Sequence, residues 1–471
     1  MIPLIKSLNF PLKRLRQSAL FLALGLHTGT QALADWPTYR ADFSRSGFSP
    51  NEIQVPLVES WTFKSTYPPK PAWQGEAKWD GYNKVYDMKA RQIFDRAFHC
   101  VARDNRVYFG SSSSDQVYCL DADTGETRWT FFTEGPIRLA PTLVANKILF
   151  GSDDGYVYCL DAESGSELWR YRGGPKDYKV PGNGRIISLW PIRTGIAVNE
   201  GIAYGAAGMF PSEGVYIFAL NLKDGTKLWE QKQSDLPAQG YILASQTKLY
   251  VPAGRNNPVI FDRLSGKRLR VASGPGGTYC LLTGDSLIFG PGKHGQLGWV
   301  DEARNDQLAT FDGNHMIVQP NISYLHGDDY LRALDRTRYL KLNEDRRLYQ
   351  AAQAKLNKEF DSYRKQPETD PAKLADFTRK LGLLGKRIDE ATAQLSECTI
   401  WNVPCRFPYH LIQAGSNLLV GGQDEFAVYS SSDGNLSFTA KVDGAAYGLA
   451  ASNGRVIVST DKGSIHCFTT L

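Results

Sequence analysis

The 471-residue sequence is 42% hydrophobic and 22% charged, so a large core can form and the composition of a disordered chain is excluded. The formal net charge is +5, and residues 1–34 contribute four basic side chains and no acidic one, so the remainder carries +1. Such a small charge gives no support for nucleic-acid binding, and we expect no nucleic-acid partner.

Residues 1–34 have the pattern of a secretory signal peptide. Basic residues precede a short apolar run at 18–26 (SALFLALGL), and residues 32–34 (ALA) fit the small-residue cleavage pattern. An uncleaved anchor is the alternative, but the run is about half of the roughly 20 residues that a spanning helix needs. We therefore predict cleavage after Ala34, a periplasmic or secreted protein, and no transmembrane span in the mature chain.

Residues 107–131 and 148–171 repeat one pattern, VYFGSSSSDQVYCLDADTGETRWTF and ILFGSDDGYVYCLDAESGSELWRY, at an offset of 40 or 41 residues. Each unit has alternating apolar runs, Gly, Asp and Ser turns, and a short run around a Trp, which is typical of antiparallel strands. Four strands in about 40 residues form one blade of a β-propeller. One blade cannot bury both of its faces, so several must pack in a ring.

The Trp that follows the turn glycine can lie flat against the neighbouring blade, with one N–H to satisfy. Weaker units continue the pattern and place Arg270, Ala309 and Phe438 at the Trp position. We predict a structural docking role for the tryptophans at this position, namely Trp61, Trp129, Trp169, Trp229 and Trp401.

Trp61 belongs to a fourth strand that no earlier strands of its unit precede, whereas residues 455–468 (RVIVSTDKGSIHCF) start a unit that the chain does not complete. We therefore predict that residues 35–471 form an all-β, eight-bladed β-propeller closed by the N-terminal strand. Without insertions the length leaves about 40 residues for each of eight blades, whereas seven would need about 46.

Three segments fall outside the repeat. Two of them, residues 64–97 and about 20 residues after Trp169, precede innermost strands and are expected on one face. The third, residues 341–397, is predicted as a helical hairpin with a coiled-coil-like stripe, and Asp370 and Pro371 are a suitable helix start. It either packs on itself or on the rim, or it is a docking arm for a partner protein. The stripe has 3-4 spacing and comprises Leu374, Phe377, Leu381, Leu384, Ile388, Ala391 and Leu395.

We expect a ligand or partner at the first two insertions, because long loops in a compact fold are often functional. Arg138, Trp190 and Tyr241 lie near the starts of inner strands and are candidates for the channel mouth and for cofactor binding, although each could equally be a packing residue. The insertions are rich in aromatic and basic residues, which include Tyr67, Trp73, Trp79, Tyr82, Arg172, Lys176, Tyr178, Lys179 and Arg185.

The seven cysteines are expected to be mostly buried and free. Cys119, Cys159 and Cys467 share one repeat position, inside the third strand. Cys398 and Cys405 are close in sequence and are a candidate disulfide pair.

No catalytic or metal-binding residue is predicted. His99, His294, His315 and His410 are scattered and are interpreted as structural or surface residues. The chain has neither the Gly-x-Ser-x-Gly of a hydrolase elbow nor the His-Glu-x-x-His of a zinc protease.

The VYCLDADTGETRW and VYCLDAESGSELW units resemble the repeat of pyrroloquinoline quinone (PQQ) enzymes, with its Trp-docking motif at 122–129 and 162–169. Stretches such as WPIRTG and VPAGRNNPVIFDRLSGK are similar to exported bacterial propellers with PQQ-like repeats. The same repeat occurs in the outer-membrane barrel assembly lipoprotein, which is a non-enzymatic scaffold. The resemblance therefore implies a propeller fold of the quinoprotein alcohol dehydrogenase-like kind and leaves the chemistry open.

Two functions follow from the resemblance. The first, which we favour, is a non-catalytic binding or assembly scaffold in the cell envelope, with a protein partner or small ligand on a propeller face and no cofactor. The second is a PQQ-dependent dehydrogenase that oxidises alcohols or sugars with PQQ and Ca²⁺. The enzymes usually have two adjacent cysteines, and the haem-containing ones add Cys-x-x-Cys-His, but neither motif occurs here. No run matches the calcium-ligand pattern of the enzymes.

Overall fold

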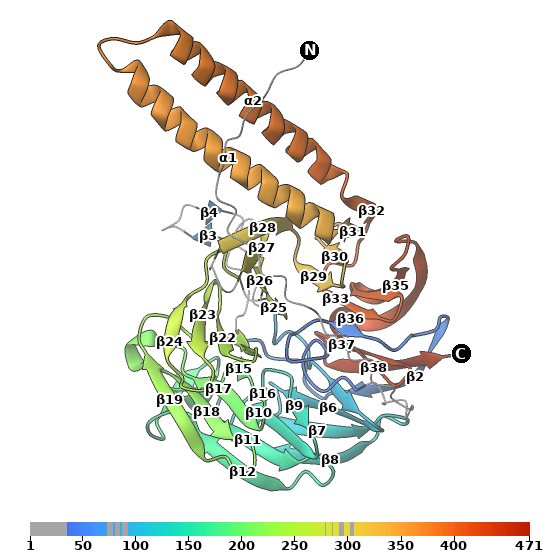
Figure 1. Cartoon of the computed structure of the whole chain (residues 1–471). Coiled ribbons are helices and arrows are strands. Elements are labelled where there is room, and N and C mark those ends of the chain that lie inside the picture. Colours follow the sequence, from blue (N-terminus) through green and yellow to red (C-terminus); the bar gives the residue numbers. More distant parts are fainter. Residues whose placement is uncertain are drawn as a thin grey trace, which may run out of the picture. The chain divides into compact units, whose positions relative to one another are not determined.

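The structure is a computed structural model that describes residues 35–72, 79–80, 85–86, 93–277, 279–284, 286–291, 296–301 and 306–471 (Figure 1). The expected signal peptide lies outside these residues. Within them the chain is mainly β, with two long helices.

Six antiparallel sheets of four strands make up most of the described chain, and in each the strands are neighbours in sequence order, as in propeller blades. The first three sheets are β5 (Val101–Arg103), β6 (Arg106–Ser111), β7 (Gln116–Asp121) and β8 (Thr127–Phe132); β9 (Thr142–Val144), β10 (Lys147–Gly151), β11 (Tyr156–Asp161) and β12 (Glu167–Arg172); and β16 (Ala197–Asn199), β17 (Ile202–Ala207), β18 (Val215–Asn221) and β19 (Lys227–Gln233).

The next three sheets follow the same plan. They are β21 (Leu243–Ala244), β22 (Lys248–Ala253), β23 (Asn256–Asp262) and β24 (Arg268–Val271); β25 (Tyr279–Thr283), β26 (Ser286–Gly290), β27 (Gln296–Asp301) and β28 (Asp306–Asp312); and β29 (His315–Val318), β30 (Ile322–His326), β31 (Tyr330–Asp335) and β32 (Thr399–Pro404).

An eight-stranded sheet joins the two ends of the described chain. Its long strand β36 pairs with β35 in its first part and, from Ala446 onward, with β37. The N-terminal strand β2 pairs antiparallel with β38, with Leu57 opposite Thr470 and Lys64 opposite Ser464. The strand order is β1 (Phe48–Ser49), β33 (His410–Ala414), β34 (Asn417–Gly421), β35 (Gln423–Ser430), β36 (Leu436–Ser452), β37 (Arg455–Thr460), β38 (Ser464–Thr470) and β2 (Leu57–Lys64).

Short elements complete the described chain. The pair β15–β20 is parallel, whereas β3–β4 and β13–β14 are antiparallel hairpins in the first and second insertions. Their bounds are β3 (Trp79–Asp80), β4 (Val85–Tyr86), β13 (Lys179–Gly182), β14 (Arg185–Ser188), β15 (Thr194–Gly195) and β20 (Gly240–Tyr241), and one 3₁₀ turn, η1, spans Pro211–Glu213.

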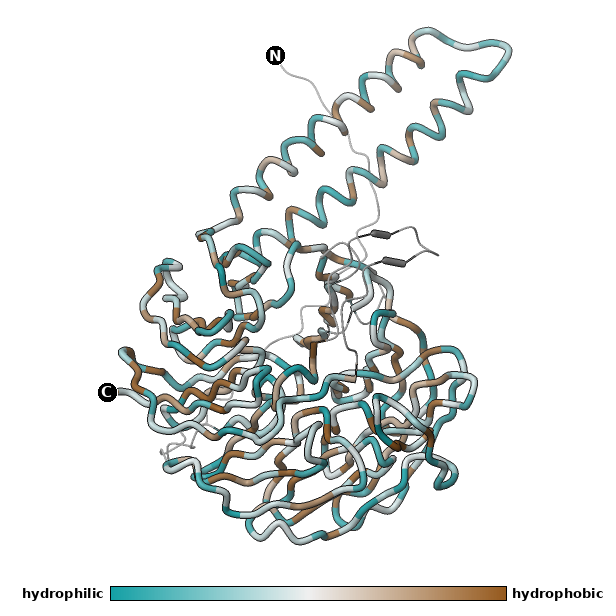
Figure 2. Tube along the Cα trace, turned by 180° about the vertical axis from the view of Figure 1, so that it is seen from behind, coloured by the Kyte–Doolittle hydropathy of each residue, from teal (hydrophilic) through white to brown (hydrophobic). Residues whose placement is uncertain are grey.

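The hydrophobic core lies between successive sheets. Strand β34 is buried along its whole length, and β26 is buried from its second residue to its end, as expected for strands that are covered on both faces. One core cluster joins Tyr204 and Ile217 of one sheet to Leu249 and Phe261 of the next. Hydrophobic residues accordingly concentrate along the strands (Figure 2). The sheets thus stabilise one another face to face.

The two helices are α1 (Arg336–Arg364), which begins directly after β31, and α2 (Pro371–Ser396), and they lie side by side (Figure 1). The helix expected from residue 341 therefore starts earlier, because the Asp335 carboxylate accepts a hydrogen bond from the Arg338 N–H and caps it. Asp370 caps α2 through the Ala372 N–H, and Pro371 occupies its first turn.

Aromatic contacts hold the helices together, because Phe377 of α2 packs against Phe360 and Tyr363 of α1 at ring distances of 5.5 and 5.8 Å. No helix among the described residues is long and apolar enough to cross a membrane.

All seven cysteines are buried and free. The candidate disulfide between Cys398 and Cys405 is not formed, because the two thiols lie in different core clusters, beside Leu334 and Phe407 respectively. The two cysteines are close in sequence, but strand β32 lies between them and places them at its opposite ends.

Candidate functional site

The docking tryptophans link successive sheets. Each of the five predicted side chains donates its indole N–H to a backbone carbonyl of the following sheet, and a turn glycine at positive φ lies under the ring. A β-bulge between third and fourth strands recurs beside this position, as at Cys119 and Leu120, and turns the Trp toward the neighbour. The bonds run from Trp61 to Ala122, Trp129 to Ala162, Trp169 to Leu222, Trp229 to Arg263 and Trp401 to Ser431, at 2.9–3.3 Å.

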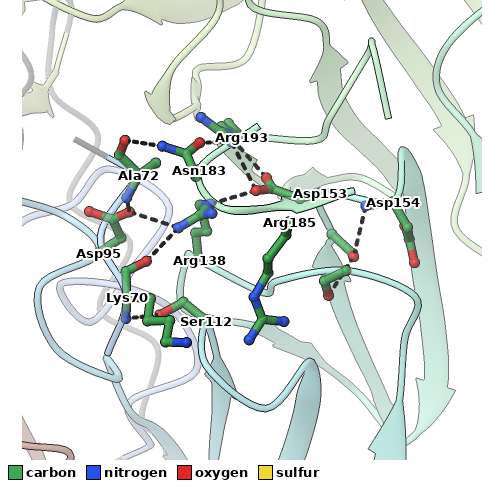
Figure 3. Close-up of polar contacts among 12 residues, drawn as sticks. Lys70, Ala72, Asp95, Ser112, Arg138, Asp153, Asp154, Asn183, Arg185 and Arg193 are labelled. Carbon is green, nitrogen blue, oxygen red and sulfur yellow. Dashed lines mark hydrogen bonds and ion pairs between the residues drawn. The ribbon is translucent and has the colours of Figure 1, made fainter. Parts of the chain in front are cut away.

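Arg138 lies in a buried cluster of alternating charges (Figure 3). Its Nε is 2.6 Å from Asp153 Oδ2, and its Nη1 is 3.4 Å from Asp95 Oδ2. Arg193 binds both oxygens of Asp153, at 2.8 and 2.9 Å. All four side chains are at most 3% exposed, so each charge is compensated by an opposite charge instead of water.

The same cluster fastens both insertions to the sheets. From the first insertion, the Lys70 carbonyl accepts from Arg138 and the Ala72 N–H donates to Asp95. From the second, Asn183 accepts from Arg193 and donates to the Ala72 carbonyl. Burial raises the pKa of Asp95, whereas the hydrogen bond from the Ala72 N–H and the charges of Arg138 and Arg193 oppose this rise. With two cations and two anions already paired, this cluster acts as a clamp and leaves no net charge for a ligand.

Tyr241 lies in a second buried group and stacks on Tyr39 at 3.8 Å with 5° between the rings. Its hydroxyl accepts a hydrogen bond from the Ala140 N–H. Trp190 is buried under the second insertion, where its N–H donates to the Glu213 carbonyl. The channel-mouth candidates are therefore all in place near the inner strands, yet each is buried and already has a partner within the chain.

The N-terminal segment, residues 36–49, occupies the space that the inner strands surround. Its backbone bonds to Ala102 of β5, Leu143 of β9, Leu282 of β25 and Gln413 of β33. Its β1 runs parallel to β33, and its Arg45 side chain reaches the carbonyl of Ile242, directly before β21. One short segment thus connects the inner strands of sheets that are far apart in sequence.

Two buried arginines anchor this segment through backbone carbonyls. Arg40 donates to Leu411 at 2.6 Å and to Met316 at 3.4 Å and lies over the ring of Tyr279. Arg45 donates to the carbonyls of Tyr39 and Ile242, and burial lowers its pKa to about 10. Arg40 and Arg45 both adopt positive φ, a costly conformation that tertiary contacts must hold in place.

Four histidines meet beside this segment, and three of them, His99, His315 and His410, were expected to be scattered. The ring of His410 lies 6.1 Å from His99 and 5.7 Å from His315, and Nδ1 of His315 lies 3.3 Å from Nδ1 of His326. His326 Nε2 donates to the Phe407 carbonyl, so its Nδ1 is the acceptor for His315. The signal in the sequence was their position, since His315 and His410 each begin an inner strand.

Burial sets the charge state of these histidines. It lowers the pKa of His99 and of His326 to about 4 each, and that of His410 well below its usual value, with Arg40 adding to the effect at His410. His99, His326 and His410 are therefore neutral at pH 7. No group of three or more His, Cys, Asp or Glu side chains within the described ranges could hold a metal ion.

Within the described part of the insertions, two of the aromatic candidates are exposed to solvent. Tyr67 and Tyr178 are 58% and 51% exposed, whereas Lys179 and Arg185 form ion pairs with Glu134 and Asp115. The remaining candidates Trp73 and Tyr82, with His294 and the side chain of Trp79, lie outside the described residues.

Comparisons with known proteins agree with this architecture. Residues 71–190 match a family model described as "Outer membrane protein assembly factor BamB". No curated protein sequence matches the chain at a significant level. Residues 71–190 thus match a family with PQQ-like propeller repeats, in agreement with the resemblance.

Similar solved structures include quinoprotein dehydrogenases and a designed protein. The quinohemoprotein alcohol dehydrogenase from Comamonas testosteroni has a TM-score of 0.60 at 12% identity, covering 92% of this chain and 80% of that one. A europium-containing methanol dehydrogenase gives 0.57 at 10%, covering 93% and 98%, and the computationally designed Ika8 protein gives 0.55 at 12%, covering 80% and 96%. At these identities the likeness concerns the fold alone.

Proposed function

We propose that the protein is a non-catalytic β-propeller that acts as a binding or assembly scaffold in the cell envelope. The observation that carries this proposal is the placement of residues 36–49, whose own side chains fill the region where the inner strands meet. A propeller that fills this region with its own chain has its remaining capacity for recognition on its outer surfaces. The matching family model describes an assembly factor, which is consistent with this role.

We further propose that residues 35–471 form eight blades closed by the N-terminal strand β2. Six four-stranded sheets support this count, together with the two halves of the eight-stranded sheet, which meet within β36. The pairing of β2 with β38 supports closure, because it joins the two ends of the described chain and leaves no free edge there.

The residues present do not fit PQQ and Ca²⁺. A planar quinone needs a flat slot between side chains, but here Tyr39 itself stacks on Tyr241 at 3.8 Å. The described side chains also offer no cluster of three carboxylate, His or Cys groups for a cation. Arg45, which lies over the ring of Tyr241, already donates to backbone carbonyls. These observations support a scaffold in preference to a dehydrogenase.

The location belongs to the same proposal. Residues 1–34 would act as the signal peptide, with cleavage after Ala34, and the mature chain would be periplasmic or secreted. N-terminal sequencing of the protein purified from the cell envelope tests this directly, since a first residue other than Asp35 would contradict it.

Titration of the purified mature protein with PQQ and Ca²⁺, followed by calorimetry and by dye-linked oxidation of alcohols and sugars, tests the function. We expect neither binding nor turnover, while a quinoprotein dehydrogenase assayed in parallel responds to both. Micromolar binding accompanied by turnover would overturn the scaffold proposal. Cross-linking in the native envelope, with and without residues 341–397, then tests whether the hairpin contacts a partner.

A further inference from the structure

The base of the hairpin carries a groove that the packing of the two helices leaves open. Leu308 of β28 and Leu340 and Leu348 of α1 line a cavity of about 660 Å³, within the size range of ligand-binding pockets. Leu348 is 61% exposed, whereas Leu340 is partly buried against the neighbouring sheet. Because leucines line this groove and Leu348 is exposed, the groove can accept an apolar side chain from another molecule.

The groove faces away from α2. Tyr349 and Phe360 of α1 contact Arg387 and Phe377 of α2, and they are 11 residues apart, which places them on one face of α1. At 3.6 residues per turn, Leu340 lies about 180° and Leu348 about 100° around the helix from Tyr349. The groove is therefore a second packing surface of α1, independent of the contact between the helices.

The surroundings of the groove are cationic. Helix α1 carries eight basic and four acidic residues. Lys341 and Arg347 line the groove together with a single acid, Glu344, and Lys355 and Lys358 follow along α1. Lys341, Lys355 and Lys358 form no ion pair among the described residues. A second copy of the same basic helix would be repelled here, whereas an acidic partner would be attracted.

We infer that this groove docks an acidic amphipathic helix of a partner protein, which inserts an apolar side chain between Leu308, Leu340 and Leu348 and places carboxylates beside Lys341 and Arg347. This is the helix-in-groove mode of recognition, with apolar anchors at three- and four-residue spacing. The inference rests on the proposed scaffold function and names the surface and the partner chemistry that serve it.

A defined peptide pair tests the inference on the whole mature chain. The probe is a fluorescein-labelled 21-residue amphipathic helix with leucines on one face and glutamates on the other, and its counterpart has lysine at every glutamate. We expect fluorescence anisotropy to show at least tenfold tighter binding of the acidic peptide, about 1.4 kcal/mol, with the preference falling as salt rises.

Matched variants locate the binding. Lys341→Glu combined with Arg347→Glu should weaken the acidic peptide at least tenfold, and Leu348→Ser should do so without a change of charge. Arg379→Glu combined with Lys386→Glu makes the same charge change on α2, where both side chains are exposed, and should change affinity less than twofold. Circular dichroism and thermal melting test whether each variant is folded. If charge reversal disturbs α1, the Leu348→Ser variant remains informative, because it changes an exposed position.

Several results would overturn the inference. They are equal binding of the two peptides, binding of neither, a Leu348-dependent dimer in analytical ultracentrifugation, and binding to vesicles of phosphatidylglycerol and phosphatidylcholine without peptide binding. The scaffold proposal fails separately, through PQQ-dependent turnover. A chain that binds neither PQQ nor peptide would keep the scaffold function and lose this docking site.

Discussion

Acidification should destabilise the protein through its buried histidines. His99 and His326 have pKa values of about 4, against an ordinary value of about 6.5. Above pH 6.5 the imidazoles are neutral in both the folded and the unfolded state, so these histidines do not reduce the free energy of unfolding. As pH falls from 6.5 toward 4, the unfolded state binds protons that the folded state does not, and stability is lost. At pH 5 each histidine accounts for about 2 kcal/mol of this loss.

Burial determines the direction, because it is the largest cause of the lowered pKa of His99, His326 and His410. Arg40 and the neighbouring histidines lower the pKa of His410, and Tyr39, which packs against His99 and His410, is neutral because burial raises its pKa to about 12. Asp95 acts in the opposite sense, since its raised pKa adds stability as pH falls, but it belongs to the separate ion cluster. The groups packed against the histidines therefore favour the neutral form.

Urea denaturation at pH 7.5, 6.0 and 5.0 measures the effect, because the free energy of unfolding is extrapolated at each pH. Between pH 7.5 and pH 5.0, the free energy of unfolding of the wild-type protein should fall by about 4 kcal/mol because of His99 and His326 together. His99→Gln and His326→Gln should each reduce that loss by about 2 kcal/mol, even where the substitution lowers stability at pH 7.5. A free energy that is independent of pH, or variants whose pH dependence equals that of the wild type, would refute the reasoning.

Other predictions concern the sheet contacts, the ion cluster and the thiols. In urea denaturation, Gly165→Ala should lower the free energy of unfolding by about 2 kcal/mol more than Gly184→Ala does. Both glycines have a φ of +73°, but only at Gly165 would the new Cβ meet a Trp ring, 2.6 Å away. Arg138→Met should lower the free energy of unfolding by about 3 kcal/mol or more, because it leaves buried carboxylates without enough opposite charge. Arg170→Met, at an exposed position, should lower it by less than about 1 kcal/mol. Equal losses would contradict a buried clamp. The melting temperature should not change on addition of a reductant, and the thiols should react with a disulfide reagent only after denaturation, because all seven are buried and free.

The local pattern of the sequence predicted the sheets well because a propeller blade is built from neighbours in the chain. The spacing of turn glycines and tryptophans at 122–129 and 162–169 identified the strands and the docking contacts, since both depend on residues within about 40 positions of one another. The caps at Asp370 and Pro371 marked α2 for the same reason, because capping is a contact between adjacent turns.

The centre of the molecule could not be predicted in this way. Arg40 bonds to Leu411 across 371 positions, and the pairing of His326 with Phe407 spans 81. Neither residue lies in a repeated pattern, and a lone Arg or His in a sequence carries no signal about what it meets. For the same reason Arg138 was a candidate for ligand binding by position only, until the structure placed Asp95 and Asp153 around it.

The sequence by itself determined the repeat, the strand order within each sheet, the docking tryptophans and the existence of the helical hairpin, because these follow from hydrophobic periodicity and turn chemistry over short distances. Only the tertiary structure decided what occupies the region between the inner strands and which face of α1 stays open. Both depend on segments that meet through the packing of whole sheets, where many distant contacts jointly fix the position of residues 36–49 and of Leu348.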